Sequence, residues 1–123
     1  MKKVLWFSQH KMSPSQKKAL GAVEIFQVDG TMQNVYEPFL AKVNGGEAYV
    51  KISSFKSLSR NFDILAVVAP INLQKQILDI AEGKPVLIAK NNRVRQDNNS
   101  FKFDFERWDQ LLKIEVVTQP WDS

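Results

Sequence analysis

The only histidine of the chain is its best candidate for acid–base chemistry. His10 follows an apolar run at residues 4–7 and precedes the start of a helix, so it falls in a loop after a strand. An imidazole there can act near neutral pH as an acid, a base or a phosphate contact, and the alternative is a surface histidine that closes the loop. We interpret His10 as a candidate catalytic residue, with Ser8 and Gln9 of the same loop as candidate ligand contacts.

Polar residues after two later apolar runs complete the candidate site. Asn72 follows Pro70, where its amide is either the cap of the next helix or a ligand contact. Lys90, Asn91 and Arg93 follow a further run, and cations with amides suit a phosphodiester or a base edge. The alternative there is a solvated turn that leads into a hairpin. We include these four residues as candidate ligand contacts.

Several classes of chemistry are disfavoured by what the sequence lacks. The chain has no cysteine, which excludes disulfides, a thiolate nucleophile and cysteine metal ligands. A lone histidine without a close carboxylate cluster predicts no metal site, and we expect no cofactor. Walker A, GxGxxG and GxSxG motifs are absent, which disfavours an ATPase, a dinucleotide-dependent dehydrogenase and a serine hydrolase. A ribonuclease-like transesterification needs fewer catalytic groups from the protein, because the attacking 2′-hydroxyl belongs to the substrate. His10 with Lys90 or Arg93 could assist it.

The elements that would position these residues alternate between strand and helix. Continuous apolar runs are typical of strands buried on both faces, and they predict strands at residues 4–7, 23–28, 63–70 and 85–89. Helices are predicted at 14–20 behind a Ser13 cap, at 54–60 and at 71–81. This alternation predicts an α/β fold, a Rossmann-like and mostly parallel sheet with flanking helices and an antiparallel C-terminal hairpin. Ligands of such sheets bind beyond the carboxyl ends of the strands.

The middle of the chain has two interpretations. Residues 39–43 and 48–52 are β-prone and flank Asn44-Gly45, which is the strongest short hairpin signal. We predict a hairpin insertion at 39–52 within a single domain of residues 1–123. The alternative is a helix over residues 34–43, capped by Asn34 and ended by Asn44-Gly45.

The C-terminal part is predicted to add two antiparallel strands. Residues 101–106 alternate between apolar and polar, and 111–117 form the last β-prone run. Phe101, Phe103 and Phe105 are therefore predicted to lie on one buried face of the sheet. They could instead stack single-stranded bases, but no basic residue on the same face supports that alternative. Trp108 and Trp121 are candidates for a subunit contact.

Composition indicates a soluble domain with a mild preference for anionic partners. The chain has 123 residues, enough for one core, and its net charge of +4 favours nucleotides, nucleic acid or acidic proteins as partners. The apolar run at residues 4–7 is shorter than the roughly 7–15 residues of a signal-peptide core, and no stretch approaches the ~20 of a membrane span. We expect a cytoplasmic protein without membrane contact.

Two of these segments resemble a known family. Phe7-Ser8-Gln9-His10 at the first strand end, and Val67-Val68-Ala69-Pro70-Ile71-Asn72-Leu73 at a later helix start, resemble the small CRISPR-accessory proteins of the ring-nuclease-like group. The resemblance implies a dimeric Rossmann-like protein of antiviral defence that binds a cyclic oligoadenylate and degrades it by metal-independent transesterification. It also implies that Ser8 and His10 line the ligand site with Asn72 beside them. Gln9 departs from the arginine common in that group, which removes a phosphate contact and argues against cleavage.

These observations favour one function and leave two alternatives open. We expect a homodimer that binds a cyclic or linear oligonucleotide signal, with cleavage as a second step. One alternative is a non-enzymatic protein-interaction or inhibitor module of a phage or mobile element, which would use the hairpin and the exposed aromatic residues. The other is sequence-independent binding of single-stranded nucleic acid, whose affinity would fall steeply with salt.

Overall fold

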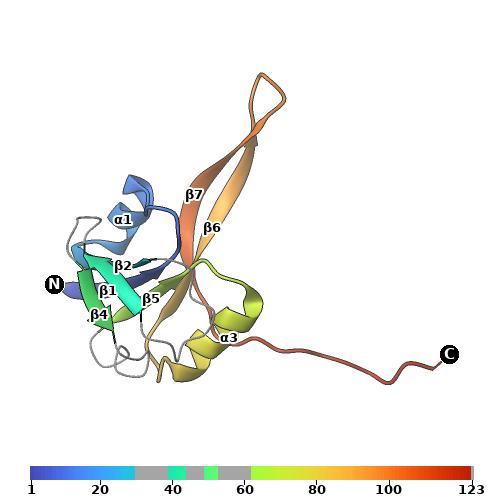
Figure 1. Ribbon diagram of the computed structural model, residues 1–123. Coiled ribbons are helices and arrows are strands. Elements are labelled where there is room, and N and C mark those ends of the chain that lie inside the picture. The colour runs from blue at the N-terminus through green and yellow to red at the C-terminus, as the bar shows by residue number, and fades with distance from the viewer. Residues whose placement is uncertain (30–38, 44–48, 53–61, 123) are drawn as a thin grey trace.

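Seven strands and two helices are described in the computed structural model, over residues 1–29, 39–43, 49–52 and 62–122 (Figure 1). They are β1 (Lys2–Phe7), α1 (Pro14–Leu20), β2 (Val23–Asp29), β3 (Phe39–Val43), β4 (Tyr49–Ile52), β5 (Ile64–Val67), α3 (Ile71–Ile80), β6 (Val86–Arg95) and β7 (Phe101–Gln110). The strands form one sheet in the order β4-β3-β2-β1-β5-β6-β7. β2, β1, β5 and β6 are parallel neighbours, whereas β3, β4 and β7 pair antiparallel at the two edges. The predicted α/β class, with a Rossmann-like parallel core and an antiparallel C-terminal hairpin, is confirmed.

Two apolar cores form on opposite faces of the sheet. Successive side chains of a strand point to opposite faces, so the apolar run of the central strand β1 supplies both cores. Leu5 and Phe7 belong to a buried cluster that also contains Leu73 and Ile77 of α3. The second cluster consists of Val4, Trp6, Met12, Val23, Ile25 and Ala66, with Leu20 of α1 packed against it. Helices α1 and α3 therefore cover opposite faces.

The inward face of α3 agrees with its predicted periodicity. Leu73, Ile77 and Ala81 are buried, and Leu78 packs against the same cluster as a partly buried residue.

Within the ranges that the structure describes, no helix is long and apolar enough to cross a membrane.

Helix α1 begins at the predicted capping box. The Gln16 amide donates to Ser13 Oγ over 3.2 Å, and the Ser13 amide donates to Gln16 Oε1 over 2.9 Å. Pro14 takes the first helical position, where a proline costs no hydrogen bond. Gly21 follows the last residue with a φ of 82°, a conformation that glycine adopts without strain. Local signals alone therefore set both ends of this seven-residue helix.

We expect Ser13→Ala to lower the free energy of unfolding by about 0.5–2 kcal/mol. The substitution leaves the Gln16 amide without its side-chain acceptor at a helix too short to be stable alone. Urea denaturation followed by circular dichroism measures the change. Ser15→Ala, in the same first turn but exposed, is the matched control. Equal effects of the two substitutions would contradict a capping role for Ser13.

The hairpin prediction for the middle of the chain is confirmed in its strands. β3 and β4 pair antiparallel, from Phe39 opposite Ile52 to Lys42 opposite Tyr49. The alternative helix is wrong for residues 39–43, because β3 completes its hydrogen bonds with the edge of β2. Ala41 of β3 is buried in the core, so the hairpin is part of the sheet. Residues 34–38, the turn at 44–48 and the predicted helix at 54–60 lie outside the described residues.

The C-terminal hairpin differs from the predicted one in both of its strands. β6 does not end at Ala89 but continues to Arg95, and it pairs with β7 along its length. The prediction that the strand ends at Ala89 and that Lys90 to Arg93 follow it in a loop or turn is therefore wrong, because those residues lie within β6. The predicted strand at residues 111–117 is also wrong, since that segment has no secondary structure. The Leu111 amide donates the last backbone hydrogen bond between the two segments, to the carbonyl of Val86, the first residue of β6. The residues after Leu111 therefore have no part of β6 left to pair with.

Candidate functional site

The strand order reverses between β1 and β5, and this point defines the candidate site. The chain moves from β1 to β2 on one side, and later to β5 and β6 on the other. Phe7 lies opposite Val67, and the Val68 amide donates to the Phe7 carbonyl over 2.7 Å. The loops that follow β1 and β5 therefore start side by side. Ligands of open parallel sheets bind at such a switch point, in the crevice outside the carboxyl ends.

Hydrogen bonds to its backbone hold the His10 loop in place. The Trp6 indole Nε1–H donates to the His10 carbonyl over 2.8 Å, from within the core beneath the loop. The Gln27 amide Nε2 of β2 donates both to the same carbonyl, at 3.0 Å, and to the Ser8 carbonyl, at 2.7 Å. His10 itself is exposed. The loop thus presents an imidazole to solvent on a backbone anchored from two strands.

Ser8 and Gln9 take different places in this loop. Ser8 is buried, and its Oγ accepts the His10 amide proton over 3.0 Å, so the hydroxyl shapes the turn. Gln9 is exposed beside it. Sequence reasoning missed Gln27, whose one available signal is its position as a polar residue near the end of an apolar strand.

Asn72 lies at the start of α3, on the neighbouring strand end. The interpretation of Asn72 as a helix cap is wrong, because the cap position is Pro70, whose carbonyl accepts from the Leu73 and Gln74 amides. Asn72 is the second residue of the helix and is exposed. The first amides of an α-helix have no acceptor within it, and Pro70 supplies no side-chain cap. This end of α3 therefore combines an exposed amide side chain with a positive helix terminus.

The remaining three predicted contacts lie on β6. Lys90 is three residues past the last pairing of β6 with β5, beside an irregularity where Glu106 of β7 has no opposite residue. Asn91 and Arg93 lie further out on a hairpin that projects from the sheet (Figure 1). We name residues 90–107 the hairpin arm. The guanidinium carbon of Arg93 lies 3.5 Å from the centre of the Phe101 ring. The structure thus has Ser8, Gln9 and His10 in the loop after β1 and Asn72 at the start of α3 after the neighbouring β5, and assigns Lys90, Asn91 and Arg93 to the arm.

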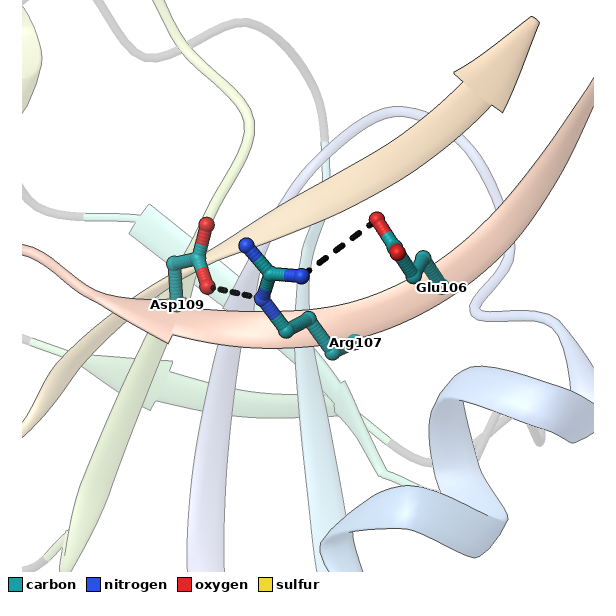
Figure 2. Close-up of polar contacts among 3 residues, drawn as sticks. All are labelled: Glu106, Arg107 and Asp109. Atoms are coloured by element: carbon teal, nitrogen blue, oxygen red, sulfur yellow. Dashed lines mark hydrogen bonds and ion pairs between the residues drawn. The ribbon is translucent and has the colours of Figure 1, made fainter.

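An arginine at the base of the arm lies between two carboxylates and pairs with both (Figure 2). Arg107 Nε lies 2.8 Å from Asp109 Oδ1, and its Nη1 lies 3.5 Å from Glu106 Oε2. The hydrogen bond to Asp109, and then the charges of Asp109 and Glu106, raise the pKa of Arg107 above its ordinary value. A guanidinium is already charged across the physiological pH range, so this shift adds no pH dependence near neutrality.

Trp108 joins the arm to the core of the same chain. Its ring packs edge-on against Trp6 at a centroid distance of 5.8 Å, and its Nε1–H donates to the Gln16 carbonyl over 3.0 Å. This intrachain role was not indicated by the sequence, which suggested a subunit contact. Trp121 is 90% exposed on the C-terminal segment.

The switch point can bind an anion and move a proton. The start of α3 attracts negative charge, Asn72 can pair with a polar ring edge, and His10 can donate or accept a proton. In the part of the chain that the structure describes, no group of three or more His, Cys, Asp or Glu is placed to hold a metal ion. In comparisons with known proteins, the chain matches no protein-family model, no curated protein and no solved structure.

Proposed function

We propose that the protein binds an oligonucleotide signal, cyclic or linear and of the oligoadenylate type, at the carboxyl ends of β1 and β5. The observation that supports the proposal is the switch point, where β1 and β5 end side by side, with His10 in the loop after β1 and Asn72 in the first turn of α3 after β5. The resemblance of these same loops to ring-nuclease-like proteins favours the same ligand class, and it implies a homodimer.

Each group at this point suits one part of such a ligand. The first amides of α3 and the net charge of +4 favour phosphate. The side-chain amide of Asn72 offers a donor and an acceptor, the pair that matches the N6 and N7 edge of adenine. His10 offers a further hydrogen bond to a phosphate or ribose oxygen. Lys90, at the base of the arm, adds a cation near the same edge of the sheet.

Cleavage at this site would need only the substrate and a proton shuttle. The ribose 2′-oxygen attacks the adjacent phosphorus while the bond to the 5′-oxygen breaks, which yields a 2′,3′-cyclic phosphate and a 5′-hydroxyl. His10 takes the 2′-hydroxyl proton or supplies one to the leaving 5′-oxygen. Gln9 carries no charge to stabilise the phosphorane, so we expect binding to be strong relative to turnover.

The test is calorimetric titration of the purified protein with cyclic tetra-adenylate, cyclic hexa-adenylate and linear oligoadenylate. We expect micromolar affinity for at least one of them, unchanged by a chelator. His10→Ala should weaken binding by roughly 10- to 150-fold, the effect of losing a hydrogen bond to a charged group. Asn72→Ala should weaken it by roughly 5- to 150-fold, the effect of losing a two-bond contact to a base edge. Lys75→Ala, exposed on α3 but away from its start, is the control.

Chromatography of the same mixtures detects cleavage, and light scattering measures the oligomeric state. A cyclic-phosphate product that disappears in His10→Ala would support the shuttle. Absence of binding to all three ligands at high micromolar concentration would refute the proposed function, as would a full loss of affinity in Lys75→Ala.

A further inference from the structure

Beyond Lys90 at its base, the hairpin arm is a solvent-exposed element that the switch-point proposal does not use. Its turn is closed by a bond of 2.8 Å from the Gln96 amide to the Ser100 carbonyl, and Arg95 Nη2 donates to Asn99 Oδ1 over 2.8 Å. At its base, the Phe105 ring lies 5.4 Å from that of Trp108, which packs in turn on Trp6. The arm is therefore anchored in the core at one end and closed at the other.

One face of the arm combines arginines with phenylalanines. The strand register places Arg95 opposite Phe101, Arg93 opposite Phe103 and Asn91 opposite Phe105. We call this set the arginine–phenylalanine face. Phe101 is 46% and Phe103 68% exposed, so the prediction of a buried face is wrong for these two rings, while Phe105 is partly buried beside Trp108. The basic residues that the sequence analysis missed on this face come from β6, whose outer half had been assigned to a loop.

The acidic residues of the arm's strands lie elsewhere and are paired. Lys102 and Asp104, on the opposite face, form an ion pair at 3.4 Å. Glu106 pairs with Arg107 at the base. Neither strand places a carboxylate on the arginine–phenylalanine face, so Arg93 and Arg95 give it a net positive charge. The face thus offers exposed ring surfaces and uncompensated cations together.

We propose that the arginine–phenylalanine face binds single-stranded nucleic acid. Exposed rings stack on unpaired bases whatever their identity, and guanidinium groups contact phosphates and stack on bases. Phe101, Phe103 and Phe105 alternate along one strand, which spaces them by about 6.8 Å, close to the base spacing of a stretched single strand. The stack of Arg93 on Phe101 already has the geometry that a base would extend. The proposal is independent of the switch-point site.

The experiment is fluorescence anisotropy of the full chain with labelled oligothymidylate and oligouridylate longer than about 16 nucleotides, and with a duplex of equal length. We expect the single strands to bind more tightly than the duplex. Phe103→Ala should weaken single-strand binding by about 5- to 150-fold without changing its salt dependence. Arg93→Ala should weaken it and reduce the slope of log affinity against log salt by about 0.7, the loss of one phosphate contact.

Matched variants separate the face from charge and folding. Lys102→Ala removes the same charge from the opposite face and should change affinity by less than Arg93→Ala, while Phe103→Tyr should retain binding. His10→Ala should leave single-strand binding intact, so this proposal and the proposed function can fail separately. Equal losses in Lys102→Ala and Arg93→Ala would overturn the proposal, as would no binding at micromolar protein in low salt. A change of oligomeric state in Phe103→Ala, with nucleic-acid affinity unaltered, would make the face a subunit contact and overturn it too.

Discussion

Replacing Trp6 by alanine is expected to lower the free energy of unfolding by about 3–5 kcal/mol. The ring is almost fully buried in the α1-side core, packs edge-on against Trp108, and donates its Nε1–H to the His10 carbonyl. A loss of this size is a large share of the about 5–15 kcal/mol that stabilises a typical domain. Urea denaturation measured by circular dichroism gives the value without relying on the fluorescence of the missing tryptophan.

Two companion variants separate packing from hydrogen bonding at this position. Trp6→Phe keeps an aromatic ring but removes the donor to His10, so it should cost less than Trp6→Ala. In this variant the His10 carbonyl still accepts a hydrogen bond from Gln27, which limits the loss of stability. Trp121→Ala, which removes a ring that is 90% exposed, should leave the stability unchanged within about 0.5 kcal/mol. A similar loss from Trp121→Ala and Trp6→Ala would contradict this assignment of the core.

Ile77→Ala is expected to cost about 2–5 kcal/mol, the second-largest effect among these substitutions. Ile77 is fully buried at the centre of the contact between α3 and the sheet, so truncation leaves a cavity there. Because α3 carries Asn72, we also expect a weaker affinity of the switch point for its oligonucleotide. Denaturation measures the first effect, and calorimetric titration of the folded variant measures the second.

The matched control for Ile77 lies on the same helix. Ile71 is also an isoleucine of α3, but it is 68% exposed. Ile71→Ala should therefore change the stability by no more than about 0.5 kcal/mol. If both substitutions destabilised the protein equally, burial on the α3 face would not be the cause.

Local signals are sufficient for the first half of the candidate site. The apolar run of β1, the Ser13 capping box and Gly21 each act within a few residues, and the structure has a strand and a helix where they predict them. Parallel strands bring their carboxyl ends to one edge of a sheet, so the sequence alone predicts His10 and Asn72 at that edge. The hydrogen bonds from Gln27 that hold the His10 loop could not be predicted from the sequence, since Gln27 lies 17 residues away along the chain.

The C-terminal half shows what only tertiary pairing decides. Asparagine, and to a lesser degree lysine, is depleted in strands. β6 nevertheless runs through Lys90, Asn91 and Asn92, because β7 offers a complementary row of backbone groups. Residues 112–117 are β-prone but form no strand, because β6 begins at Val86, whose carbonyl already accepts from the Leu111 amide. A helix closes its hydrogen bonds within its own segment, whereas a strand depends on a partner elsewhere in the chain. Because of that dependence, the arm and the arrangement of Arg93 beside Phe101 could not be predicted from the sequence. The loop of His10 at the end of β1 could, because local signals locate it.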